Sequence, residues 1–198
     1  MSTIDLLERY AAGERSFAQM SLPEADLRLV ALTDVDLSHA NLASALLSQA
    51  DLRHANLTAT TLWRADLSEA VLTLAILERS NLIRAIVYQA NLQKASLVRA
   101  DLRLAELCHA DLSYADLTGA NLSYANLRGV NLMGANLSRA NMTGANLSDT
   151  NLSNANLTKA ILSRTNLHNA NLSGITIAET NCLEASARSS SGDLSRIS

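Results

Sequence analysis

Residues 120–149 read ANLSY ANLRG VNLMG ANLSR ANMTG ANLSD, six copies of one five-residue unit. The unit Ala-Asn/Asp-Leu-Ser/Thr-x extends in both directions without an insertion and covers residues 15–179 in 33 copies. Its central position, from Phe17 to Ile177, is Leu in 29 of these copies. A single repeated structure therefore accounts for most of the chain.

A period of five residues fits neither an α-helix nor a flat strand. Five helical residues rotate the central Leu by about 140° per copy, so no apolar stripe forms. In a strand, an odd period would send successive Leu side chains to opposite faces. The pattern instead favours a short extended piece followed by a corner, with the Ala and the central Leu pointing inward and the other three positions pointing outward. Repeated corners coil the chain, and stacked coils pair as parallel strands.

Runs such as Ala120 to Tyr124 and Ala135 to Arg139 resemble the pentapeptide repeat family over about five-sixths of the chain. The resemblance implies an all-β fold, a right-handed, four-sided parallel β-helix with four repeats in each coil. Neither the handedness nor the four sides follow from the spacing. The repeats would make about eight coils, and at a strand spacing of roughly 4.8 Å the rod would be about 40 Å long.

Residues 1–14 precede the repeats and predict a short capping α-helix. Ser2 or Thr3 can cap a helix over residues 3–12, and Gly13 can end it. A solenoid end exposes core and strand edge, so we expect this helix to cover the first coil near Phe17 and Met20. The apolar stripe expected to make the contact comprises Ile4, Leu7, Tyr10 and Ala11.

The repeat region is predicted to span residues 15–181, followed by a C-terminal tail over residues 182–198. The Ser-rich part of the tail is expected to be disordered. Two alternatives remain for the C-terminal end of the solenoid. Residues 183–188 fold back as a short cap, or the final coil pairs with a second copy and gives a weak homodimer.

Composition and charge exclude several classes of protein. No apolar run approaches the length of roughly 18 residues that a membrane helix needs, so we expect no membrane span. The first residues lack the basic and apolar regions of a signal peptide, and the expected location is the cytoplasm. The two cysteines, Cys108 and Cys182, lie several coils apart and are expected to remain free thiols. The formal net charge of −3 does not favour direct binding to nucleic acid.

Catalysis finds little support in the sequence. All four histidines fall at outward positions, and the two on the same side, His109 and His168, would lie about three coils apart. There is no phosphate-binding Gly loop and no His/Cys cluster with metal-ligand spacing. We therefore predict a protein that is not an enzyme, with no catalytic residue, no cofactor and no metal.

The polar positions of the repeat have a structural explanation. Asn or Asp before the central Leu is expected to bond its side chain to the nearby backbone at the corner, as in Asx-turns. Several glycines of the second half fall at the last repeat position, where a type II turn accepts a positive φ. Neither feature requires a ligand.

The first half holds most departures from the pattern. Residues 63–88 place many apolar side chains outward. Either a corner packs on itself or a coil bulges there, or the side chains form a partner-binding patch. The candidate patch comprises Trp63, Val71, Leu74, Ile76, Ile83, Ile86 and Tyr88.

If four repeats make one coil, charged residues can be assigned to sides. The side centred on Leu22, Leu42 and Leu62 has an outward net charge of +2, and the next three sides have −3, −1 and zero. Such charges usually serve solubility, but like charges one coil apart would also attract an anionic partner. The candidate basic side comprises Arg64, Arg84, Arg103 and Arg164.

Two functional hypotheses follow. The first is a non-enzymatic rigid rod that acts as a protein-binding scaffold or regulator with an unknown partner. The second comes from the resemblance, since some members of the family are similar to B-DNA in width and charge and protect DNA gyrase from inhibitors. Those members are strongly acidic and dimerise through an end, whereas this chain has a net charge of only −3. The resemblance also implies a bacterial, and in particular cyanobacterial, source.

Overall fold

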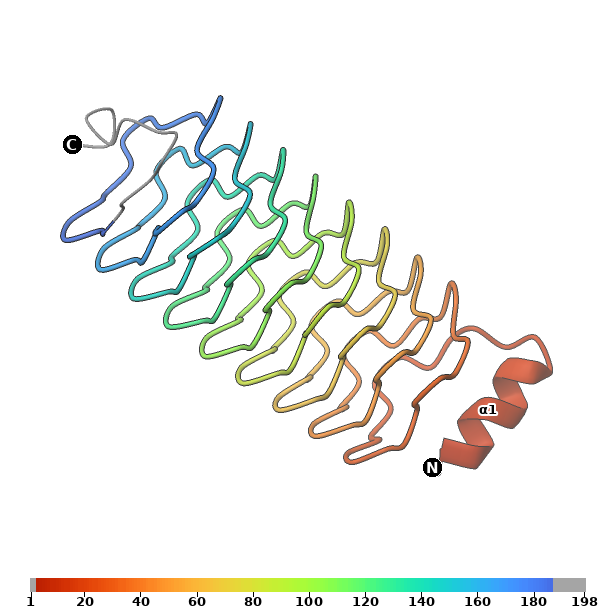
Figure 1. Cartoon of the computed structure of the whole chain (residues 1–198). Coiled ribbons are helices and arrows are strands. Elements are labelled where there is room, and N and C mark those ends of the chain that lie inside the picture. The colour runs from red at the N-terminus through yellow and green to blue at the C-terminus, as the bar shows by residue number, and fades with distance from the viewer. Residues whose placement is uncertain (1–2, 187–198) are drawn as a thin grey trace.

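A computed structural model describes residues 3–186 of the chain. One α-helix, α1 (Thr3–Ala11), lies at the N-terminal end, and the chain then winds through a stack of similar coils to the opposite end (Figure 1). Parallel β-bridges join positions that are four repeats apart, from Ser16↔Asp36 to Asn166↔Ser186. The chain between Ser16 and Ser186 therefore makes about eight and a half coils of four repeats each. Four bridges per coil define four sides. The ladder of parallel bridges therefore confirms the predicted four-sided, parallel arrangement of the coils.

One repeat explains how the coils hold together. The N–H of Leu122 donates to the carbonyl of Asn141 in the next coil at 2.7 Å, and the N–H of Asn121 donates to Ala100 in the previous coil at 2.9 Å. At the corner, the N–H of Ala125 donates to Leu122 at 3.0 Å. The predicted Asx-turn is confirmed by the Asn121 Oδ1, which accepts the N–H of Ser123 at 3.1 Å. Each side leaves too few residues between corners for a regular strand, so the pairing takes the form of isolated bridges.

The corners impose an unusual backbone conformation. The last residue of almost every repeat has a positive φ, and 29 of these residues are not glycine, with φ between 54° and 62°. The positive φ at the third turn position agrees with the predicted type II turn. Each such residue costs on the order of 1 kcal/mol in an L-amino acid. The packed core and the intercoil hydrogen bonds must offset this cost.

The core is a narrow column of Leu and Ala. Every central residue from Phe17 to Leu167 is buried, with at most 3% of its surface exposed. The few polar residues at the inward Ala position satisfy their hydroxyl groups within the column. Thr60 Oγ1 donates to the carbonyl of Leu37 at 2.8 Å, and Thr165 Oγ1 donates to that of Met142 at 2.9 Å.

Helix α1 covers the first coil as predicted, and Leu7 and Tyr10 of the predicted stripe pack against the core, but the most buried residue is Leu6. Leu6 is fully buried in one cluster with Phe17, and Tyr10 donates its hydroxyl to the carbonyl of Thr33 at 3.0 Å. The predicted stripe was wrong for Ile4, which is 68% exposed, and for Ala11, which is also exposed. The entry angle of the chain into the first coil turns the Leu6–Tyr10 face inward, and no periodicity within so short a helix fixes that angle.

The C-terminal end is less well covered than the middle. The solenoid continues to Ser186, beyond the predicted boundary at residue 181, because Cys182 to Ala185 form another corner. Leu172, Ile175 and Ile177 pack against the core but stay partly exposed. The part of the predicted tail and of the predicted fold-back cap that follows Ser186 lies outside the described residues.

Candidate functional site

The seven residues of the candidate patch do not share one surface. Residues 63–88 make more than one full coil, so they pass around all four sides. Val71 lies on the side of the Asp51–Val71 bridge, Ile76 on that of the Asn56–Ile76 bridge, and Ile86 on that of the Asp66–Ile86 bridge. Leu74 and Tyr88 lie at two further corners. Trp63 and Ile83 are neighbours, one coil apart at the same corner. Their role in binding a partner stays a prediction.

Trp63 and Ile83 lie at the same corner of successive coils. The stacking of the coils aligns the outward residues of this corner in two neighbouring columns along the rod. The N–H of Arg64 donates to the carbonyl of Ile83 at 3.1 Å, and that of Arg84 donates to Arg103 at 3.0 Å. The same contact continues from Leu104 to Ser123. The resulting surface, here called the ridge, comprises Trp63, Arg64, Ile83, Arg84, Leu104 and Tyr124.

The ridge exposes large side chains on a backbone that is fixed by hydrogen bonds. Trp63, Leu104 and Tyr124 are 39%, 44% and 62% exposed, although each would gain free energy from burial. Trp, Tyr and Arg are the residue types that contribute most to binding energy at protein interfaces. Because the corners are already ordered, the ridge itself would lose little backbone conformational entropy on binding a partner.

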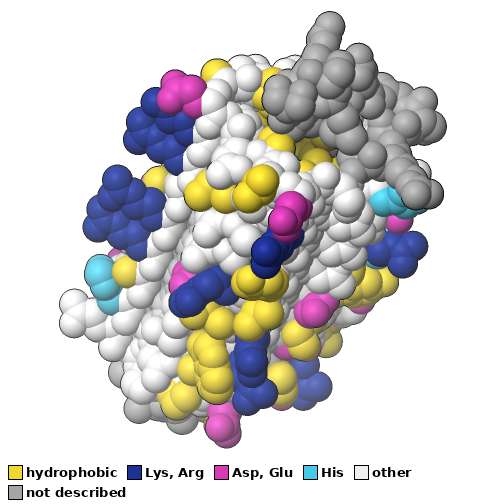
Figure 2. Space-filling model, turned by 90° about the vertical axis from the view of Figure 1, so that its left-hand side faces the viewer, with side chains coloured by type: hydrophobic (Ala, Val, Ile, Leu, Met, Phe, Trp, Pro, Cys, Tyr) yellow, Lys and Arg dark blue, Asp and Glu magenta, His cyan; other side chains and the backbone are white. Residues whose placement is uncertain are grey.

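Hydrophobic side chains and Lys or Arg also lie together on the surface drawn in Figure 2, where they alternate across a largely white, polar background. At the ridge the alternation is direct, because the Arg64 guanidinium lies 5.0 Å from the centre of the Trp63 ring. This cation–π contact holds the arginine beside the exposed aromatic surface.

The four arginines of the candidate basic side differ in their pairing. Arg103 bonds Asp101 at 2.8 Å, and Arg164 bonds Glu184 at 2.8 Å. Arg64 and Arg84 have no ion-pair partner among residues 3–186. They lie one coil apart, about 4.8 Å along the rod, where two like charges repel by about 1 kcal/mol in water. An anionic group placed between them would be attracted by both.

The more regular second half of the rod satisfies its own polar groups. Asn151 donates its side-chain amide to Asn131 at 3.2 Å, and Asn131 donates in turn to Asp111 at 3.1 Å. A second ladder runs from Asn146 through Asn126 to Glu106. Both ladders end on a carboxylate in the same coil. Their amides are already paired, so these sides offer a partner fewer unsatisfied groups than the ridge does.

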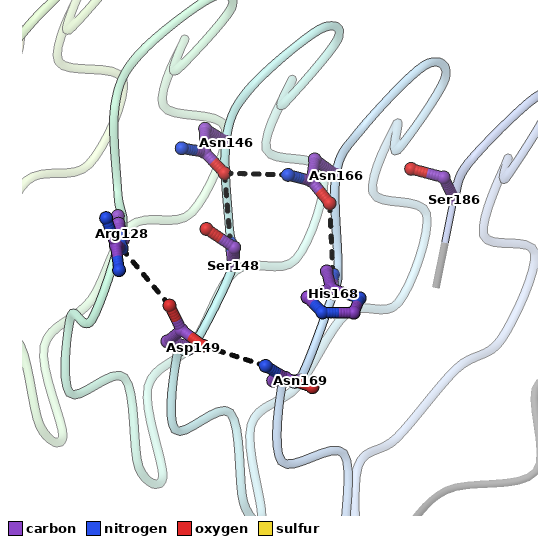
Figure 3. Close-up of a pocket in the computed structure, with 8 residues that line it drawn as sticks. All are labelled: Arg128, Asn146, Ser148, Asp149, Asn166, His168, Asn169 and Ser186. Carbon is purple, nitrogen blue, oxygen red and sulfur yellow. Dashed lines mark hydrogen bonds and ion pairs between the residues drawn. The ribbon is translucent and has the colours of Figure 1, made fainter. Parts of the chain in front are cut away.

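A shallow depression of about 620 Å³ lies on the side that follows the ridge, near the C-terminal end. Most of its side chains bond one another (Figure 3). Arg128 Nε donates to Asp149 at 3.1 Å, and Asn169 donates to the other carboxylate oxygen at 3.1 Å. Asn169, followed by Arg128, holds the pKa of Asp149 below its usual value. The carboxylate is therefore ionised and already paired, which does not suit it to act as a general acid or base.

The other titratable groups show no catalytic arrangement among residues 3–186. His109 meets Tyr88 edge to face, with ring centres 6.2 Å apart. Cys108 and Cys182 are free thiols, and burial raises the pKa of both. In the described part of the chain no group of three His, Cys, Asp or Glu side chains could hold a metal ion. The helix in this part is too short and too polar to cross a membrane.

The fold and the surface thus define a repeat protein, a closed β-solenoid whose exposed corners carry the features that distinguish one side from another. The repeats match the family of pentapeptide repeats over residues 16–49, 50–87, 88–123, 110–149 and 135–174. The chain belongs to the pentapeptide repeat family, whose fold is a right-handed quadrilateral β-helix.

Several solved structures of the family are similar to this chain. HetL, a pentapeptide repeat protein involved in heterocyst differentiation regulation from the cyanobacterium Nostoc sp. strain PCC 7120, is 35% identical, with 98% of this chain and 99% of that chain covered and a TM-score of 0.47. A trypsin-treated form of QnrB1, a plasmid-mediated fluoroquinolone resistance protein, is 16% identical, with 87% and 88% covered and a TM-score of 0.57, and it shares the fold. Rfr23 from the cyanobacterium Cyanothece 51142 is 25% identical over 91% and 99%, with a TM-score of 0.19. No curated protein matches the chain.

Sequence reasoning missed two residues of the ridge. Leu104 and Tyr124 lie outside the stretch 63–88, yet they continue the column of Arg84 one and two coils further along the rod, as the intercoil hydrogen bonds at the corner show. The signal was present in the sequence, because the two residues follow Arg84 at whole multiples of four repeats. A search by column instead of by contiguous stretch would have found them.

Proposed function

We propose that the protein is a non-enzymatic rigid rod that binds a protein partner through the ridge, as a scaffold or regulator in the cytoplasm. The observation that carries this proposal is the ridge itself, in which exposed Trp63, Leu104 and Tyr124 and half-buried Ile83 lie around Arg64 and Arg84, two arginines without an ion-pair partner among residues 3–186. Of these residues, Trp63, Tyr124 and the two arginines are of the types enriched in interface hot spots, and they are held on an ordered backbone. The involvement of HetL in differentiation regulation agrees with a regulatory role.

The test is partner capture from the source cell with matched variants. The double variant Arg64→Glu/Arg84→Glu reverses both ridge charges. Arg79→Glu/Arg99→Glu is its control, since these two arginines are also exposed, one coil apart and at positive φ, but on another corner. A partner that binds the wild type and the control but not the ridge variant would support the proposal. Equal loss in both variants would refute the ridge as the binding surface.

The alternative is DNA mimicry toward a topoisomerase such as gyrase. It requires a rod whose sides are dominated by negative charge, and the ridge presents arginine instead. The likeness to QnrB1 at 16% identity extends to the fold alone. A gyrase supercoiling assay with added protein separates the two functions, because a mimic would protect or inhibit the enzyme and a scaffold for another partner would leave supercoiling unchanged.

A further inference from the structure

We infer that the ridge receives an acidic amphipathic α-helix of the partner protein, laid along the axis of the rod. The inference rests on the proposed function and specifies its binding partner. Three features of the ridge support it: its backbone bonding, its charge and its spacing.

The backbone bonding excludes an added strand. From Ile83 to Tyr124 the N–H groups of the ridge are all used, either by the next coil or by an Asx side chain. Arg84 donates to Arg103 at 3.0 Å and Tyr124 to Thr143 at 2.9 Å, while Ile83 donates to the Asn81 side chain at 3.1 Å. An extended peptide gains affinity from free backbone groups at a sheet edge, and the stretch of the ridge from Ile83 to Tyr124 offers it no free N–H donor. A helix pairs its backbone N–H and C=O groups internally, so it needs no backbone hydrogen bond from this surface.

The charge selects the sign of the helix. Arg64 and Arg84 lack an ion-pair partner among residues 3–186, and their guanidinium groups suit carboxylates in bidentate geometry. The exposed Trp63 and Leu104 and the half-buried Ile83 lie beside them and require apolar side chains opposite. A helix with carboxylates flanking an apolar stripe supplies both.

The spacing fits a helix along the axis. Successive coils present ridge side chains about 4.8 Å apart. One helical turn advances about 5.4 Å, so the mismatch is about 0.6 Å per coil, whereas same-face residues of a strand are about 6.8 Å apart. From Trp63 to Tyr124 the ridge spans three coil intervals, which correspond to fewer than three turns of helix. The accumulated mismatch stays under about 2 Å, within the reach of arginine side chains.

A fluorescence titration tests this inference on the full chain. Trp63 is the single tryptophan of the protein, so its emission reports from the ridge itself. The probe is a synthetic peptide of about five helical turns without tryptophan, with Leu at helical spacing flanked by Glu. We expect a saturable blue shift of the emission and an affinity that falls as salt concentration rises. Arg64→Glu/Arg84→Glu should weaken binding at least tenfold, and Arg79→Glu/Arg99→Glu should change it less than twofold.

Two control probes keep the inference falsifiable. The same peptide with two central prolines cannot form the helix, and it should bind at least tenfold more weakly. A duplex DNA oligonucleotide should leave the emission unchanged. Equal binding of the proline peptide, preference for the duplex, or no response to the helical peptide up to about 1 mM would overturn the inference. If partner capture still depends on Arg64 and Arg84 in that case, the proposed function stands and only the helical partner is refuted.

Discussion

A glycine beneath an aromatic ring gives a sharp test of the corner geometry. Gly134 has a φ of +66°, and a Cβ atom added there would lie 2.7 Å from both Cδ1 and Cε1 of Tyr114 in the previous coil. Gly119 has the same φ of +66°, but its Cβ would lie 3.6 Å from Arg99 Cγ, an ordinary contact. Gly134→Ala and Gly119→Ala therefore have the same backbone cost, and only Gly134→Ala adds a clash with an aromatic ring.

The expected magnitudes follow from these two terms. Alanine at positive φ costs about 1–2 kcal/mol, partly offset by about 0.4–1 kcal/mol from the lower entropy of the unfolded chain. Gly119→Ala should therefore destabilise the fold by about 0–1.5 kcal/mol. Gly134→Ala should cost on the order of 1 kcal/mol more, because the Tyr114 ring, 56% exposed, must leave its contact and loses part of its buried area.

Urea denaturation followed by circular dichroism measures the difference, as a shift of the midpoint at constant slope. The double variant Tyr114→Ala/Gly134→Ala provides the control. With the ring removed, alanine at position 134 should cost no more than alanine at position 119. Equal destabilisation by Gly134→Ala and Gly119→Ala in the presence of Tyr114 would refute the reasoning.

Three further predictions concern the core, the ladders and the C-terminal end. Leu122→Ala should cost about 2–5 kcal/mol in free energy of unfolding, and Ser153→Ala at an outward position less than about 0.5 kcal/mol, in the same urea assay. Burial acts to raise the pKa of Asp111, but hydrogen bonds led by the Ser113 N–H outweigh burial and hold this pKa below its usual value. The ionised carboxylate therefore stabilises the fold above about pH 4, and this stabilisation is lost as the pH falls. Asp111→Ala should therefore lower the free energy of unfolding by about 1–3 kcal/mol at pH 7 and by progressively less below pH 4. Asp111→Asn keeps one acceptor oxygen and should cost less at pH 7. A stability difference between wild type and Asp111→Ala that stays constant across pH would contradict this prediction. Sedimentation across a concentration series should detect a weak dimer through the partly exposed C-terminal coil, and a strict monomer, unchanged when residues 187–198 are deleted, would rule it out.

Much of the fold could be predicted because every copy of the repeat places the same residue types in the same physical environment. The central Leu and the Ala two residues before it can be buried only if the chain turns after every fifth residue, and both are buried throughout the middle of the rod. The Asx-turns and the positive φ at glycine corners follow from residue type in the same way. The face of α1 could not be predicted, because Ile4 and Leu6 are equally apolar and only the docking angle chooses Leu6.

The candidate surface was predicted less well, for a reason that lies in the outward positions. The sequence by itself determined which side chains point outward, including Trp63, Arg64 and Arg84. It did not determine which outward side chains meet, because a five-residue period is compatible with coils of three sides as well as four. With three repeats per coil Trp63 would stack on Glu78, and with the observed four it stacks on Ile83. The angle at each corner decides between the two, and that angle depends on how the Leu side chains of all sides fill one column, which only the tertiary structure resolves.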